Sequence, residues 1–265
     1  MLALHARELP QRDDLCGAFC VSLALRATGA QTSPGGEPLD QDAVALAAGS
    51  VVSEVPDPSI LPFGEPGRRD YRLELPLIGD PLASGTTAAG LIAAVAELTG
   101  GRAVAIPYAD PWTVATLAGL FELAAAQPHP VALVANHATR HLWGTHPGHD
   151  RLLSYLLDGD LDGPPADWDV GHFACILARV RGPRGSAYVL ADTYPSLGVL
   201  GVHAQPQERL AAAIARHEGP AGGVLVIVSD EDAPAVRAGA RAIGLREGVW
   251  DNGSVPSTAV RETLA

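Results

Sequence analysis

Residues 11–28 read QRDDLCGAFCVSLALRAT. The spacing of the apolar residues predicts a helix from Cys16 to Thr28, so the cysteine stands in its first turn. There it meets the positive end of the helix dipole, which favours the thiolate over the thiol. Gly17 leaves room for a substrate carbonyl to approach the backbone beside the sulfur. Gln11 can donate from its side-chain amide to an oxyanion. The stretch therefore predicts a nucleophilic cysteine.

A thiolate nucleophile needs a base, and a histidine far along the chain is the candidate. Gly171-His172-Phe173 opens a predicted strand that runs to Val180. Alternation along this strand places His172 on the same face as Ala174 and Ile176, whereas Phe173 lies on the other face. Small and apolar neighbours of this kind are expected for an imidazole at the floor of a site. The following predicted strand ends on Asp192. If the two strands form a hairpin, Asp192 lies beside His172 and fixes the tautomer and orientation of its ring.

The order Gln, Cys-Gly, His and Asp resembles the papain-like cysteine peptidases, and most closely the bacterial branch that cuts double-glycine leader peptides. The similarity lies in the order of motifs across roughly Leu9 to Val228, not in continuous identity. Further motifs similar to that branch are Gly85-Thr86-Thr87 before a helix, the apolar segment His129-Pro130-Val-Ala-Leu-Val, Gly171-His172-Phe173, and Asp192-Thr-Tyr-Pro.

The resemblance implies a role for each residue of the site. Cys16 is the nucleophile and His172 the general base, and Asp192 orients the histidine. Gln11 completes the oxyanion hole with the backbone N–H of Cys16. The implied function is thiol-dependent acyl transfer through an acyl-enzyme, peptidase-like or amidase-like, on a dedicated substrate.

Other residues are expected to contact the substrate, and other functions are compatible with the same scaffold. Gly17, Gly171 and Trp143 are the predicted substrate contacts. The expected substrate is a peptide, or a small molecule with an amide or thioester bond, either free or bound to a carrier. The alternatives are an amide-bond-forming acyltransferase or peptide ligase, and a non-catalytic binding module that keeps the fold.

These signals predict an α+β fold of papain-like type, with N-terminal helices packed against a C-terminal antiparallel sheet and the site in the cleft between them. A catalytic domain is expected over residues 1–229, with insertions at about 51–81 and 136–169, followed by a C-terminal extension over 230–265 with one helix and a polar tail. The other expected helices run from Asp40 to Ala48, from Thr86-Thr87 to Leu98, from Trp112 to Ala126, from Arg151 to Leu157 and from Gln205 to His217. The other expected strands run from Arg102 to Tyr108, Val131 to Ala135, Ser186 to Asp192, Gly198 to Val202 and Gly223 to Val228.

Composition excludes several other classes of protein. All 18 basic residues are arginine, against 30 acidic residues, so the net charge is −12. Without lysine there is no Walker-type phosphate loop, Schiff-base nucleophile, pyridoxal-phosphate anchor or kinase of the usual pattern. The acidic balance argues against nucleic acids and anionic membrane surfaces as partners. Three cysteines, no recognisable signal peptide and no apolar run of membrane-spanning length predict a cytoplasmic protein.

Two clusters of potential metal ligands are interpreted as ordinary loops. His137, His141, His146 and His149 lie in a stretch broken by glycine and proline, without the rigid spacing of metal ligands. The sequence DGDLDG at residues 158–163 resembles the start of a calcium loop, but prolines follow it and the closing position holds Asp instead of Glu. Neither a metal nor a cofactor is therefore expected. The lack of a Cys-x-x-Cys motif argues against a redox role.

Overall fold

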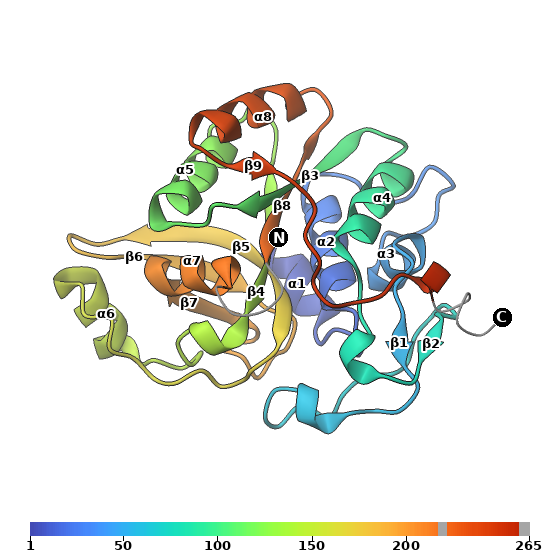
Figure 1. Cartoon of the computed structure of the whole chain (residues 1–265), viewed down its shortest axis with the longest axis horizontal. Helices are drawn as coiled ribbons and strands as arrows, with labels where there is room; N and C mark the ends of the chain where they lie inside the picture. The colour runs from blue at the N-terminus through green and yellow to red at the C-terminus, as the bar shows by residue number, and fades with distance from the viewer. Residues whose placement is uncertain (217–221, 260–265) are drawn as a thin grey trace.

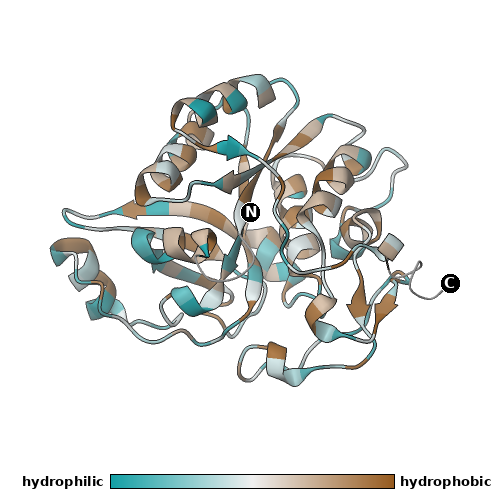
Figure 2. Ribbon diagram, in the orientation of Figure 1, coloured by the Kyte–Doolittle hydropathy of each residue, from teal (hydrophilic) through white to brown (hydrophobic). Residues whose placement is uncertain are grey.

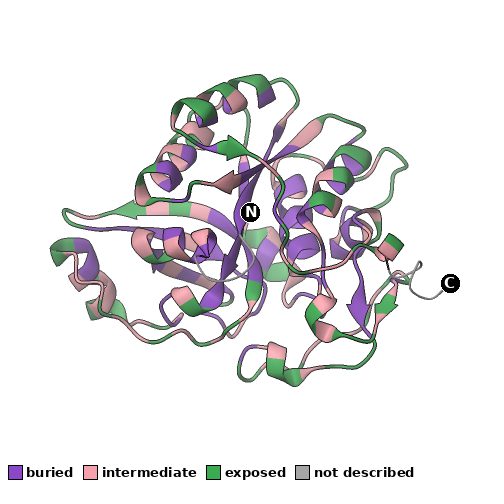
Figure 3. Cartoon of the chain, in the orientation of Figure 1, coloured by how far each residue is buried: buried purple, intermediate pink, exposed green. Residues whose placement is uncertain are grey.

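The computed structural model describes residues 1–216 and 222–259, and its centre is a large antiparallel sheet (Figure 1). Within these residues, seven strands follow the order β7-β6-β5-β4-β8-β3-β9. Their bounds are β3 (Ala103–Asp110), β4 (Ala132–Ala138), β5 (Gly171–Arg181), β6 (Ser186–Ala191), β7 (Val202–Pro206), β8 (Gly223–Ser229) and β9 (Arg246–Glu247). The two strands at the middle, β4 and β8, are apolar and buried along most of their length (Figures 2 and 3).

Helices cover both faces of this sheet, which makes the arrangement three layers deep. Alternation along β5 sends Phe173 and Cys175 to one face, and Ala174 and Ile176 to the other, as the sequence predicts. The first face packs against α2 (Cys16–Ala27) and α4 (Ala88–Thr99), and α3 (Gln41–Ala47) packs on these two helices. The second packs against α5 (Val114–Ala125), α7 (Gln207–Ala215) and α8 (Ala233–Ala242). The fold is therefore α+β as expected, but helices cover both faces of the sheet and not only the one face assigned to the N-terminal helices.

Local side chains set the ends of these helices. The Asp40 carboxylate accepts the N–H of Ala43 at 2.9 Å, and the Thr87 hydroxyl accepts the N–H of Gly90 at 3.0 Å. Both are N-cap bonds that satisfy donors left free at a helix start. At its other end α4 stops at Gly100, which has a left-handed φ of 60°. The helices expected at these positions are confirmed.

The two predicted insertions contain short elements. In the first, β1 (Val52–Ser53) pairs in parallel with β2 (Leu77–Ile78), and the short 3-10 turns η1 (Pro58–Ile60) and η2 (Pro81–Ala83) lie nearby in the chain. In the second, β4 runs on to Ala138 before η3 (Thr139–His141) and α6 (His149–Asp158). A short helix that the sequence did not reveal, α1 (Leu2–Glu8), precedes the cysteine-bearing stretch.

The strand expected from Gly198 to Val202 is displaced. It begins at Val202, as β7, because the residues before it form a turn. Gly198, Leu200 and Gly201 have φ values of 66°, 52° and 76°, a left-handed conformation that an extended strand does not use. The following helix, α7, ends at Ala215, and its expected last residue, His217, lies outside the described residues.

The boundary expected at residue 229 does not separate two packing units. Val236 of α8 is buried in the core beside α5, and β9 pairs with β3. Trp250 belongs to the core under α2. The Asn252 amide donates to the carbonyl of Thr86 at 3.0 Å. The C-terminal segment is thus part of the same body. Residues 260–265 of the predicted tail lie outside the described part of the chain.

Candidate active site

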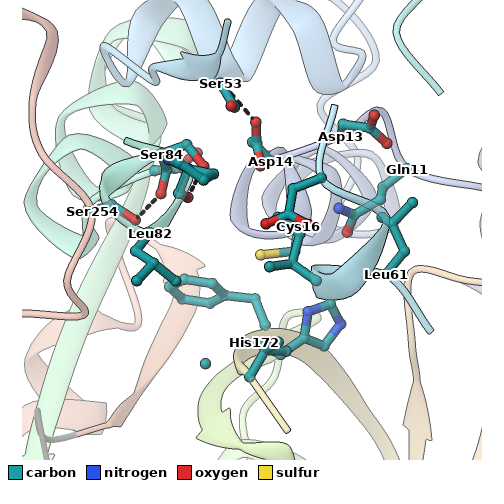
Figure 4. A pocket seen from close by; sticks show the side chains of 18 of the residues that line it. Gln11, Asp13, Asp14, Cys16, Ser53, Leu61, Leu82, Ser84, His172 and Ser254 are labelled. Carbon is teal, nitrogen blue, oxygen red and sulfur yellow. Dashed lines mark hydrogen bonds between the residues drawn. The ribbon is translucent and has the colours of Figure 1, made fainter. Parts of the chain in front are cut away.

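A pocket of about 410 Å³ opens where the start of α2 meets the start of β5. Figure 4 shows Gln11, Cys16 and His172 among the side chains that line it. The rest of its wall comes from parts of the chain that are far apart in sequence: Asp13 and Asp14, residues between 53 and 61, Arg69, residues between 81 and 86, Asn136, residues 168–171, Phe173, Tyr194, Asn252 and Ser254.

Cys16 is the first residue of α2, and it is the partly exposed member of the three free cysteines. The other two, Cys20 and Cys175, are buried, and their thiols donate to backbone carbonyls at 3.4 and 3.6 Å. The first N–H groups of a helix have no intrahelical acceptor. The backbone N–H of Cys16, in the first turn of α2, therefore has no acceptor within its own helix.

The turn that leads into α2 carries backbone strain. Asp14 has a φ of 65°, a left-handed conformation that costs a residue with a side chain about 1 kcal/mol or more. Its carboxylate accepts the N–H of Ser53 at 2.8 Å, which ties the start of α2 to β1 (Figure 4). Burial raises the pKa of Asp14, although hydrogen bonds from Ser53 and Ser84 act in the opposite direction. The strained residue lines the pocket next to Cys16.

His172 is the second residue of β5, and it is almost completely buried. Its Nε2 lies 2.9 Å from Oδ1 of Asp192, so the hairpin expected from the sequence does bring the two residues together. Burial alone would lower the pKa of His172. The charge and hydrogen bond of Asp192, helped by the side chain of Cys16, outweigh burial and raise this pKa to about 10. The ion pair with Asp192 therefore favours the imidazolium form of His172.

Asp192 follows the last residue of β6 and is equally buried. Its backbone N–H donates to the carbonyl of Gly201 at 2.7 Å, and its Oδ1 also accepts the N–H of Thr193 at 2.7 Å. Burial would raise the pKa of this carboxyl, but His172 and His203 hold it well below its ordinary value. Asp192 is thus a fixed, ionised partner for His172.

A family described as a family of unknown function (DUF6885) matches residues 1–251. The chain belongs to this family. The matched region contains Gln11, Cys16, His172 and Asp192, together with nearly all of the pocket wall. No curated protein matches the chain.

Gln11 reaches the pocket in this DUF6885 chain, as the sequence predicts. Its side chain is 3% exposed, and its backbone N–H donates to the carbonyl of Thr193 at 2.9 Å. This bond joins the irregular stretch before α2 to the loop that carries Asp192. The Gln11 Oε1 atom has no hydrogen-bond partner among the described residues. The backbone bond thus fixes the position of Gln11 beside the pocket, and its side-chain oxygen is left unpaired among the described residues.

Two of the predicted substrate contacts are corrected, and one lies in the pocket. Gly171 is exposed and lines the pocket. Gly17 instead faces the core, since a Cβ there would come within 3.0 Å of Leu91 Cδ1; its small size serves helix packing. Trp143 lies outside the pocket. Its ring is 2% exposed and packs on Tyr155, which makes it a core residue.

Trp168 and Tyr194 are aromatic residues that line the pocket, in place of the predicted Trp143. Trp168 packs edge-on against His172, with ring centroids 4.8 Å apart, and its Nε1 donates to the carbonyl of Ile60 at 3.0 Å. Tyr194 stacks beside His172 at 6.4 Å. Burial, followed by the negative charges of Cys16 and the nearby aspartates, raises the pKa of Tyr194. The only sequence signal for these two residues is their closeness in the chain to His172 and Asp192.

The histidines expected in one loop are separated by the fold. His137 is a fully buried residue of β4, whereas His146 and His149 lie at the surface near α6. In the part of the chain that the structure describes, no group of three or more His, Cys, Asp or Glu side chains is arranged to hold a metal ion. Among the same residues, no helix has the length and apolar character needed to cross a bilayer.

Proposed function

We propose that this chain is a thiol-dependent acyl-transfer enzyme of papain-like design, acting as a peptidase or amidase on a dedicated substrate. One observation carries the proposal. A buried, hydrogen-bonded His172–Asp192 pair opens onto the same pocket as the partly exposed thiol at the start of α2. A cysteine, a histidine and an orienting carboxylate are the groups that such chemistry requires.

In the proposed reaction the Cys16 thiolate attacks the carbonyl carbon of the substrate, and the carbonyl oxygen becomes an oxyanion. The Gln11 amide and the Cys16 backbone N–H donate hydrogen bonds to this oxyanion. The His172 imidazolium gives its proton to the leaving amine or thiol, which departs and leaves an acyl-enzyme. His172, now neutral, removes a proton from the incoming water, whose attack releases the acid and restores the thiolate.

The substrate that fits the proposal is a peptide, or a small molecule with an amide or thioester bond. We do not expect the enzyme to cut polypeptides of unrelated sequence without selection. The pocket is walled by loops from several parts of the chain, including exposed apolar side chains at Leu82 and Val55. Such a wall offers a substrate contacts from several loops at once, which favours a dedicated substrate. Purified protein should therefore leave denatured casein intact, and broad digestion of casein would contradict a dedicated substrate.

The direct test is the rate at which iodoacetamide alkylates Cys16, measured against pH by peptide mass spectrometry. The wild type should react rapidly at pH 6, and His172→Ala should lose this reactivity because the thiolate loses its imidazolium partner. Cys20 and Cys175 provide internal controls, since both are buried and should remain unlabelled in the folded protein. Equal behaviour of Cys16 in the two proteins would remove the basis for catalysis, and a binding module would then be the better description.

The same protein can be used to determine whether water or an amine accepts the acyl group from the acyl-enzyme. A panel of simple thioesters, offered with and without an added amine, distinguishes hydrolysis from amide formation by product mass. Free acid in both conditions supports the peptidase-like or amidase-like proposal. Amide as the main product would instead assign the chain to the amide-bond-forming enzymes that share this intermediate.

A further inference from the structure

Asp192 has a second buried partner that the proposed mechanism does not use. While its Oδ1 faces His172, its Oδ2 lies 3.2 Å from Nε2 of His203. His203 is a residue of β7 and is 5% exposed. Both oxygens of the carboxylate therefore face an imidazole ring. Two imidazolium ions on one carboxylate would divide its charge between them, so the protonation state of His203 matters for His172.

Gln205 fixes that state through the other nitrogen of His203. Gln205 is fully buried on the same face of β7, two residues further along, and its Nε2 lies 3.1 Å from His203 Nδ1. Its amide also forms a pair of bonds with the backbone of Trp143, one from the N–H at 2.8 Å and one to the carbonyl at 2.9 Å. The backbone N–H can only donate, so the Gln205 atom facing it must be the oxygen.

The orientation of the Gln205 amide then determines the tautomer of His203. The Gln205 nitrogen faces His203 Nδ1, and an amide nitrogen only donates, so Nδ1 must be an unprotonated acceptor. The single ring proton of His203 is therefore on Nε2, where it is donated to Asp192 Oδ2. A protonated Nδ1 would set two donors against each other in a buried place, which is costly.

We propose that His203 and Gln205 are positioning residues for the Cys16–His172–Asp192 site: Gln205 keeps His203 a neutral donor, and His203 holds Asp192 in register with His172. This inference rests on the proposed function of that site. His203 anchors the carboxylate without adding a second positive charge, so the full negative charge of Asp192 remains available to the His172 imidazolium. Other titratable groups around the carboxylate are His137, Cys20 and Tyr194, and His5 contacts its backbone carbonyl.

The tautomer can be observed directly. In protein labelled with ¹⁵N-histidine, long-range proton–nitrogen correlation spectra distinguish the two neutral tautomers and the imidazolium. His203, assigned by the loss of its signals in His203→Gln, should be the neutral Nε2–H tautomer in the folded protein. The imidazolium or the Nδ1–H tautomer would overturn the proposal. Gln205→Glu replaces the donor beside Nδ1 with an acceptor, and it should convert His203 to the imidazolium.

The effect on the site is measured by alkylation of Cys16. His203→Phe keeps a ring but removes the donor, and alkylation at pH 6 should fall roughly tenfold, as for the loss of a hydrogen bond to a charged group. His203→Gln places an amide donor near the position of Nε2 and should restore most of the rate. The matched control is His5→Phe, which removes a similarly buried imidazole whose one hydrogen bond among the described residues is to the backbone carbonyl of Asp192. Its pH profile should match that of the wild type.

These variants separate failure of the inference from failure of the proposed function. Loss of alkylation in His172→Ala, with a wild-type profile in both His203→Phe and Gln205→Glu, would overturn the positioning role and leave the catalytic proposal intact. A wild-type profile in His172→Ala would overturn both. If His203→Phe does not fold, the tautomer spectra and the near-isosteric Gln205→Glu still decide the question.

Discussion

His137 and His172 lie directly opposite each other on β4 and β5, with ring centroids 5.9 Å apart and ring planes at 86°. The two rings are in opposite electrostatic situations. Burial, and next the charge of His172, lower the pKa of His137 to about 3, whereas Asp192 raises that of His172. Neither nitrogen of His137 has a hydrogen-bond partner among the described residues. His137 is thus a neutral imidazole that packs edge-on against the charged ring of His172.

Replacing His137 should therefore cost little. In His137→Leu the volume is similar and two buried, unpaired nitrogens are removed, so the free energy of unfolding at pH 7 should stay within about 1 kcal/mol of the wild type or increase. Chemical denaturation measures this change. Alkylation of Cys16 at pH 6 should persist, because the His172–Asp192 bond is untouched. A large loss of stability would show that His137 has a partner in the folded protein.

The His172–Asp192 pair should make stability depend on pH. The pKa of His172 is raised from an ordinary value of 6.5 to about 10, so the folded protein binds a proton that the unfolded chain releases between these values. Its stabilising contribution is complete below pH 6.5 and is lost as the pH rises toward 10. Wild-type stability should decline over this range, and His172→Gln should show a flatter profile. Parallel profiles from urea titrations would contradict the raised pKa.

Asp14 gives a prediction of opposite sign. Its pKa is raised by burial, so the ionised carboxyl is disfavoured in the folded protein, and this penalty grows as the pH rises above the ordinary value of 3.8. Asp14→Asn keeps an acceptor for the Ser53 N–H, tolerates the left-handed φ and carries no charge. Its melting temperature should exceed that of the wild type at pH 7, with a smaller difference at pH 3. A lower melting temperature at pH 7 would show that the charge is needed.

Gln11 should matter for acyl transfer but not for thiol reactivity. Gln11→Ala removes a donor to the oxyanion, and loss of one such donor lowers the turnover rate by about 10². Alkylation by iodoacetamide forms no oxyanion, so its rate at Cys16 should be unchanged. Measuring both rates on one preparation separates this role from a general collapse of the pocket. A parallel loss in both assays would assign Gln11 a structural function only.

The contact between His172 and Asp192 could be predicted from sequence because it depends on local patterns. Alternation fixes the face of each residue, and turn residues fix the hairpin that joins them. The second partner, His203, could not be found in this way. Residues in the turn before β7 adopt left-handed backbone conformations, which local sequence patterns do not predict reliably. The expected strand therefore ended at Val202, one residue short of His203.

Local sequence also could not show which tryptophan lines the pocket. Trp143 and Trp168 lie in one polar stretch, and nothing in their neighbouring residues distinguishes a core position from a pocket position. The distinction comes from distant partners, Tyr155 for the first and Ile60 for the second. The contribution of Asn252 to the pocket is likewise set by its bond to Thr86, across a separation that local signals do not cover.

The position of the C-terminal segment has a consequence for how the protein is made. Ser254 donates to the carbonyl of Ser84 at 2.9 Å, and Trp250 donates to Asn136 beneath the pocket. Because synthesis runs from the N-terminus to the C-terminus, Cys16 leaves the ribosome well before Asn252 and Ser254, which line the same pocket. A nascent chain therefore carries the Cys16 thiol before the wall of its pocket is complete. The site becomes complete only once synthesis has passed residue 254.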